Sequence, residues 1–128
     1  MQYRESIERA IELAQSGERQ RAIEMLDELL TDARIAADSA WIAQLAKAAA
    51  VIVEDLGDMS RVATYYREAR DSDASDPYLR LALGKVLIEL GQPSEAAVEL
   101  SAGLELARAH QEPELVNVIS RMLADSRR

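Results

Sequence analysis

The stretch that decides the fold is residues 77–110, which read PYLRLALGKVLIELGQPSEAAVELSAGLELARAH. Apolar residues recur every three or four positions on both sides of Gly91, the spacing of amphipathic helices. Pro77 and Pro93 stand where helices would begin, and Gly91 stands where the first helix would end. The stretch therefore predicts two helices joined by a short turn.

The same pattern recurs along the whole chain. Single glycines at positions 17, 57 and 91 are separated by 40 and then 34 residues. A shift of 74 residues places Gly17 on Gly91 and Leu26 on Leu100. A two-helix unit that repeats at this period is typical of an α-solenoid. We therefore predict one all-α domain over residues 1–128 with about seven helices: pairs at about 3–36, 38–72 and 77–110, and a last helix at 113–126.

Several local features follow from this pattern. Asp58 and Asp76 are predicted helix N-caps, and either Asp38 or Ser39 could cap the third helix. That helix is predicted to run to Leu56, and residues 71–75 to form a loop. Helical spacing predicts that Tyr66 is buried and Tyr65 exposed, and that Trp41 packs in the core against Leu29, Leu30 or a neighbouring residue.

Composition and charge restrict the function. The chain has 128 residues, 48% of them hydrophobic, which is enough for one domain with a core. The chain has a net charge of −8 and contains no cluster of basic residues. Nucleic acid and anionic membrane surfaces are therefore disfavoured partners. The absence of cysteine excludes disulfides, thiolate metal sites and cysteine nucleophiles.

The sequence offers no catalytic constellation. His110 is the one histidine and is predicted to be exposed or to cap a helix, because a zinc site needs three or four convergent ligands. The carboxylate pairs Glu24/Glu28 and Glu95/Glu99 have helical spacing and are predicted to lie on a solvated face. No glycine-rich phosphate loop occurs. We predict a protein that is not an enzyme and has no metal, cofactor or catalytic residue.

The location of the protein is predicted from the absence of targeting signals. The first five residues, MQYRE, do not begin an apolar signal segment. The longest apolar run, residues 48–53, is too short to span a bilayer. The simplest expectation is a cytoplasmic protein.

Residues 77–110 resemble a tetratricopeptide repeat (TPR). The resemblance lies in Leu83-Gly84, Leu87, Gly91, Ala96, Leu100 and Leu104 at the spacing of that family, and weaker copies cover nearly the whole chain. Small residues have a physical role there, because Gly84 and Ala96 let the paired helices approach closely. The chain departs from the pattern at Gly103, where alanine is usual, and at Arg9, where a core leucine is usual.

The resemblance implies a right-handed superhelix of helical hairpins, whose concave groove holds a peptide or helix of another protein. An apolar strip edged with charge would line it, and exposed apolar side chains favour a covering ligand. For Ile7 and Ile11, ordinary core packing is an open alternative. The groove residues implied for partner binding are Ile7, Ile11, Lys47, Val51, Glu54, Tyr78, Leu81, Lys85, Ile88 and Glu89.

Two functions therefore remain. The first is a non-catalytic scaffold or adaptor that binds a partner peptide or helix in the groove. The second is an assembly module that forms a homodimer through its terminal helices. In the second case, the last helix would contribute the apolar residues Leu115, Val116, Ile119, Met122 and Leu123.

Overall fold

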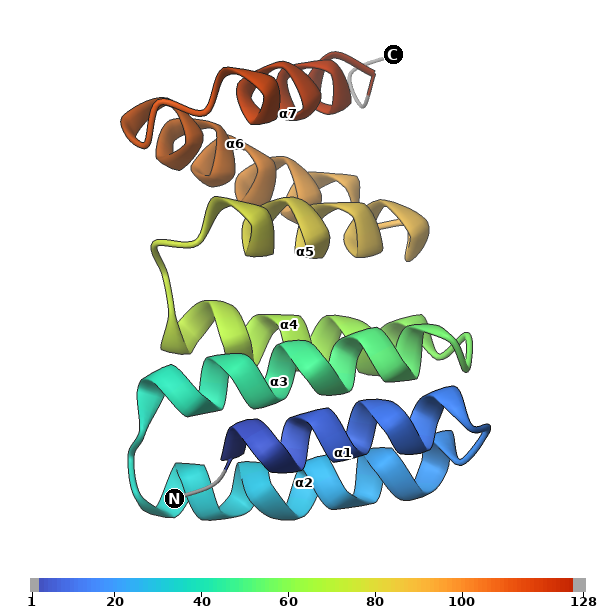
Figure 1. Ribbon diagram of the computed structural model, residues 1–128. Coiled ribbons are helices and arrows are strands. Elements are labelled where there is room, and N and C mark those ends of the chain that lie inside the picture. Colours follow the sequence, from blue (N-terminus) through green and yellow to red (C-terminus); the bar gives the residue numbers. More distant parts are fainter. Residues whose placement is uncertain (1–2, 126–128) are drawn as a thin grey trace. The chain divides into compact units, whose positions relative to one another are not determined.

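The computed structural model describes residues 3–125, and these form seven α-helices (Figure 1). The all-α prediction is confirmed. Residue 126, the predicted end of the last helix, lies outside the described residues. The helices are α1 (Tyr3–Gln15), α2 (Arg19–Ile35), α3 (Ser39–Glu54), α4 (Met59–Ser72), α5 (Pro77–Glu89), α6 (Pro93–Ala109) and α7 (Pro113–Asp125).

Aspartates begin three of the helices. The side chain of Asp38 accepts a hydrogen bond from the Trp41 amide, so Asp38 rather than Ser39 caps α3. Asp58 and Asp76 cap α4 and α5 in the same way. Such a cap satisfies backbone N–H groups that have no partner inside the helix, and it is worth about 1 kcal/mol.

The turn within each helical pair uses a left-handed residue. Gly17, Gly57 and Gly91 have φ of 92°, 78° and 73°, a region that glycine enters at little cost. The turns that follow α2 and α6 instead place Ala37 and Gln111 at φ of 52° and 56°. These two positions are 74 residues apart, the shift that overlays the two halves of the sequence. The backbone therefore repeats even where the residues differ.

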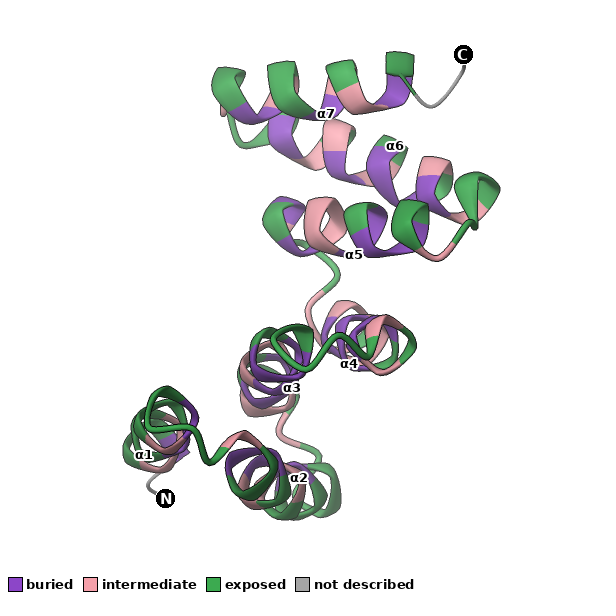
Figure 2. Cartoon of the chain, turned by 90° about the vertical axis from the view of Figure 1, so that its right-hand side faces the viewer, coloured by how far each residue is buried: buried purple, intermediate pink, exposed green. Residues whose placement is uncertain are grey.

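The contacts group the chain into two compact units that divide between Ala74 and Ser75. In the first unit α1 packs on α2, α2 on α3, and α3 on α4, and α1 also contacts α3. Figure 2 shows α1 and α3 on one side of this unit and α2 and α4 on the other. Its core is built from fully buried aliphatic side chains, among them Ile23, Leu26, Leu30, Leu45, Val53 and Val62.

In the second unit α6 packs between α5 and α7. Gly84 allows the close approach of α5 and α6 that the sequence predicts, because a Cβ at this position would lie 2.6 Å from Leu100 Cδ2. Gly103 has the same role, since its Cβ would lie 2.9 Å from Arg80 Cβ. The departure from the alanine of the repeat pattern is therefore explained by a tight crossing of α5 and α6.

Four local predictions are wrong. Helix α3 ends at Glu54 rather than Leu56, and α4 continues to Ser72, which shortens the predicted loop at residues 71–75. Tyr65 is buried, because its hydroxyl reaches across to a carboxylate on α2. Glu99 is also buried, because Arg80 on α5 pairs with it at 2.8 Å.

Candidate protein-binding groove

A groove runs between α1 and α3 on one side of the first unit and has a volume of about 470 Å³. Ile7, Ile11 and Ala14 line it from α1, at the i, i+4, i+7 spacing of a single helix face. Ala48, Val51 and Ile52 line it from α3, while Gln15, Arg19, Gln44, Lys47 and Asp55 supply its polar groups.

Four residues implied by the TPR resemblance meet in this groove: Ile7, Ile11, Lys47 and Val51. Glu54 is exposed on α3 but is not among the lining residues. The sequence reading missed Ala48 and Ile52, although both follow Gln44 at i+4 and i+8 on the same helix. It also missed Arg19, whose position at the start of α2 beside the mouth of the groove depends on the turn geometry.

The groove leaves apolar side chains in contact with solvent. Val51 is 56% exposed and Ile11 is 40% exposed. Complete burial of one such side chain stabilises by about 1.5–3 kcal/mol, so an apolar segment that covers both gains several kcal/mol. Ile7 is half-buried and still lines the groove, so it belongs to this surface rather than to the core alone.

One ion pair lies at the end of the groove. Arg19 Nε is 3.8 Å from Asp55 Oδ2, and the two side chains are 42% and 63% exposed. A pair this exposed contributes little to stability. It does place one charge of each sign beside Val51 and Ile52, where a bound segment would pass.

A second cavity continues the groove toward the start of α3. It has a volume of about 640 Å³ and is lined by Arg4, Ile7, Glu8, Ala40, Trp41 and Gln44. Ile7 and Gln44 line both cavities, so the two are contiguous. The half-buried Trp41 ring packs on Tyr3, with centroids 5.3 Å apart and planes inclined by 44°.

The remaining residues predicted for partner binding lie on α5 in the second unit. Tyr78 and Ile88 are 56% and 42% exposed, and Lys85 and Glu89 are also exposed. Leu81 is half-buried against the core around Leu100 and offers less surface than the sequence suggested. The Tyr78 hydroxyl donates to Glu112 Oε1 at 2.8 Å, and this bond raises the pKa of Tyr78 above its usual value.

The residues predicted for self-association divide into two groups. Leu115, Ile119 and Leu123 are buried in one cluster with Leu100 and Ala107 of α6. Val116 and Met122 are half-buried beside that cluster. A second copy of the chain could therefore reach only the latter two of the five predicted residues, because α7 uses its apolar face to cover α6.

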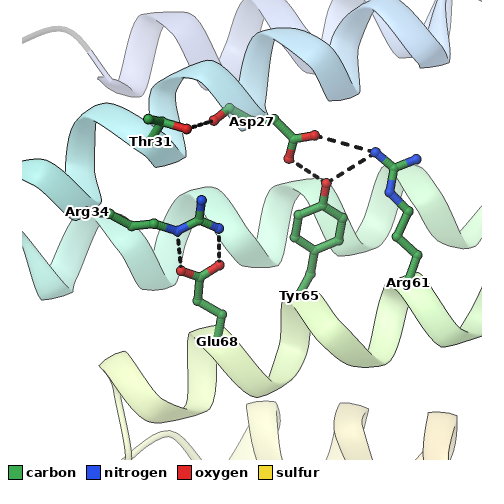
Figure 3. Close-up of polar contacts among 6 residues, drawn as sticks. All are labelled: Asp27, Thr31, Arg34, Arg61, Tyr65 and Glu68. Atoms are coloured by element: carbon green, nitrogen blue, oxygen red, sulfur yellow. Dashed lines mark hydrogen bonds and ion pairs between the residues drawn. The ribbon is translucent and has the colours of Figure 1, made fainter.

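Polar groups outside the groove tie α2 to α4 (Figure 3). Tyr65 donates its hydroxyl proton to Asp27 Oδ1 at 2.5 Å, and Arg61 Nη2 lies 3.4 Å from Asp27 Oδ2. Arg34 and Glu68 form a two-point ion pair at 2.6 and 2.5 Å. These residues join the two helical pairs on the side away from the groove.

Within residues 3–125, no group of three or more histidine, cysteine, aspartate or glutamate side chains is arranged to hold a metal ion. Over the same residues, no helix is both long and apolar enough to cross a bilayer. His110 is exposed at the C-cap of α6, as the sequence predicted.

Comparison with solved structures finds chains of similar architecture. The translocator chaperone SycD of Yersinia enterocolitica type III secretion, in complex with a peptide of the translocator YopD, matches with a TM-score of 0.76 and 20% identity over 97% of this chain and 91% of that one. PcrH of Pseudomonas aeruginosa, in complex with the chaperone-binding region of PopD, matches with a TM-score of 0.73 and 15% identity over 96% and 89%.

A third structure, an alternative dimer of SycD, matches with a TM-score of 0.75 and 20% identity over 98% of this chain and 91% of that one. No protein-family model matches the chain, and no curated protein has a similar sequence. At this identity the likeness shows the fold alone, an all-α arrangement of helical pairs.

Proposed function

We propose that this chain is a non-catalytic scaffold that holds a segment of another protein in the groove between α1 and α3. The observation that carries the proposal is the exposure of Ile11 and Val51 on facing helices of one continuous groove. Two similarly folded proteins were solved in complex with a segment of another protein, SycD with a peptide of YopD and PcrH with the chaperone-binding region of PopD. We also infer that the helical pairs are tetratricopeptide repeats.

Self-association is the weaker alternative. SycD, which has a similar fold, was solved as an alternative dimer. In this chain α7 buries Leu115, Ile119 and Leu123 within its own unit. A homodimer would have to use other exposed apolar side chains, and those in the α1–α3 groove are the first candidates.

The test is selection of random twelve-residue peptides displayed on phage against the immobilised full chain. Enriched peptides should bind the wild type and lose at least tenfold in affinity for Val51→Asp, because the new carboxylate would have to lose water beside an apolar ligand. The matched control is Ile35→Asp, at a side chain that is 81% exposed at the end of α2 and outside the groove.

Circular dichroism should give the same helical content for all three proteins. Peptides that bind Val51→Asp as tightly as the wild type would exclude the groove as the binding surface. Loss of binding in both variants would mean that general charge, rather than the groove, decides the interaction.

A further inference from the structure

The two halves of the groove differ in chemistry. Around Val51 the lining is mainly apolar, whereas the second cavity is lined by Trp41 together with the charged residues Arg4 and Glu8. Building on the proposed function, we propose that the occupant is an extended segment of about six residues that places a lysine or arginine on the Trp41 indole, with apolar residues over Ile11 and Val51.

The length of the groove sets the length of an extended segment that would fill it. Trp41 and Asp55 mark its two ends on α3, and the rise of a helix places them about 21 Å apart. An extended chain covers that distance with about six residues. An extended segment of about six residues would therefore reach from Trp41 to Asp55.

Trp41 favours a cation. Trp41 is half-buried, its ring packs on Tyr3, and the residue lines the second cavity. Among the aromatic side chains, the indole face attracts a lysine or arginine most strongly. Glu8 lines the same cavity and supplies a carboxylate for the same cation, whereas Arg4 opposes it.

The charge of the first unit also favours a cation. Residues 1–74 contain 9 basic and 15 acidic side chains, a net charge of −6 out of −8 for the whole chain. Five of those basic residues are already paired with acids of the same unit: Arg19, Arg21, Arg34, Arg61 and Arg70. Glu5, Glu8 and Glu12 are all exposed on α1. A basic segment therefore meets an attractive potential as it approaches.

The test uses the enriched peptides, which should carry a lysine or arginine at a fixed offset from two apolar residues. One such peptide and its copy with glutamine at the basic position are titrated into the full chain. Trp41 is the only tryptophan, so its fluorescence reports occupancy of this half of the groove. We expect the basic peptide to shift the emission and to bind about tenfold more tightly than its glutamine copy.

Charge variants of the chain provide the matched comparison. Glu8→Gln should weaken binding of the basic peptide several-fold, whereas Arg4→Gln should tighten it. Glu24→Gln, at an exposed acid of α2 outside both cavities, should leave the affinity unchanged. All three substitutions are at exposed side chains, so circular dichroism should show an intact fold.

Failure of this inference is distinguishable from failure of the proposed function. Three results would overturn the inference and leave the groove function standing, if the peptides still depend on Val51. The peptides could show no preference for a basic residue, they could leave Trp41 fluorescence unchanged, or they could bind Glu8→Gln more tightly than the wild type. A wild-type dimer that Val51→Asp converts to a monomer would make a second copy the occupant and overturn it as well. Absence of any peptide that depends on Val51 would remove both proposals.

Discussion

At the scale of single residues, Tyr65 shows how a distant partner changes the role of a side chain. It is 7% exposed, and its hydroxyl donates to Asp27 on another helix. Burial and the hydrogen bond to the Asp27 carboxylate raise the pKa of Tyr65 to about 12, and burial has the larger effect. Both effects favour the neutral phenol, because ionisation would place a second negative charge beside Asp27.

This shift predicts how stability depends on pH. The phenol of an unfolded chain ionises near its usual pKa of about 10, whereas folded Tyr65 keeps its proton until about pH 12. Between these values the unfolded state binds fewer protons, so the free energy of unfolding should fall as pH rises from about 10 to 12. Urea unfolding across this range measures it, and Tyr65→Phe should show a smaller fall.

At pH 7, Tyr65→Phe should cost about 1.5 kcal/mol, the lower end of the range for a hydrogen bond to a charged acceptor, because the Asp27 side chain is 44% exposed. Tyr78→Phe is the matched control, since the Tyr78 side chain is 56% exposed and its hydroxyl bonds to Glu112 at the surface. Equal losses of unfolding free energy in the two variants would mean that the hydrogen bond to Asp27 stabilises the fold no more than the surface bond to Glu112 does.

At the scale of elements, α7 acts as the cover of the second unit. Its apolar face packs on Leu100 and Ala107 of α6 through Leu115, Ile119 and Leu123. A helical repeat needs such a terminal helix, because the last pair would otherwise expose its apolar face. The sequence predicted the apolar face of α7, and the structure shows that most of this face is buried against α6.

Two adjacent residues of α7 test this role. Ile119 is fully buried, whereas its neighbour Val118 is 43% exposed. Ile119→Ala should cost about 2–4 kcal/mol through lost burial and an unfilled cavity. Val118→Ala should change stability by less than about 0.5 kcal/mol. Thermal unfolding of the two variants measures the difference, and a comparable loss for both would argue against the packing of α7 on α6.

At the scale of the whole molecule, net charge decides colloidal behaviour. The chain carries a net charge of −8 at pH 7 and has an isoelectric point near 4.7. Repulsion between molecules should keep it dispersed at pH 7 and disappear as the pH approaches 4.7. Light scattering during a titration should therefore rise near pH 4.7 and fall again when the pH is returned to 7. Uniform scattering across the range would show that charge does not control association.

The fold was largely predictable from the sequence because its determinants are local. Apolar spacing, aspartate caps and the turn glycines each act within a few residues, so Asp58, Asp76 and Gly91 could be placed without a partner in view. The error at α3, which ends at Glu54, is of the size expected when apolar spacing continues beyond the last helical hydrogen bond.

The groove was predictable only in part. Helical spacing and the repeat pattern identified Ile7, Ile11, Lys47 and Val51, which share one face of α1 or α3. They could not identify Arg19, because its place in the groove depends on how the α1–α2 turn aims the next helix. Nor could they show that Trp41 lies against Tyr3, since that contact joins residues 38 positions apart.

The sequence by itself therefore determined the helices, their repeat, the acidic surface and the absence of cysteine chemistry. Periodicity, composition and charge are properties of neighbouring residues or of the whole chain, and they need no knowledge of how helices pack. The tertiary structure alone decided that Tyr65 and Glu99 are buried, that the apolar face of α7 packs on α6, and that Trp41 lines the second cavity. These outcomes depend on which side chains of different helices meet, and helical spacing specifies a face without specifying what covers it.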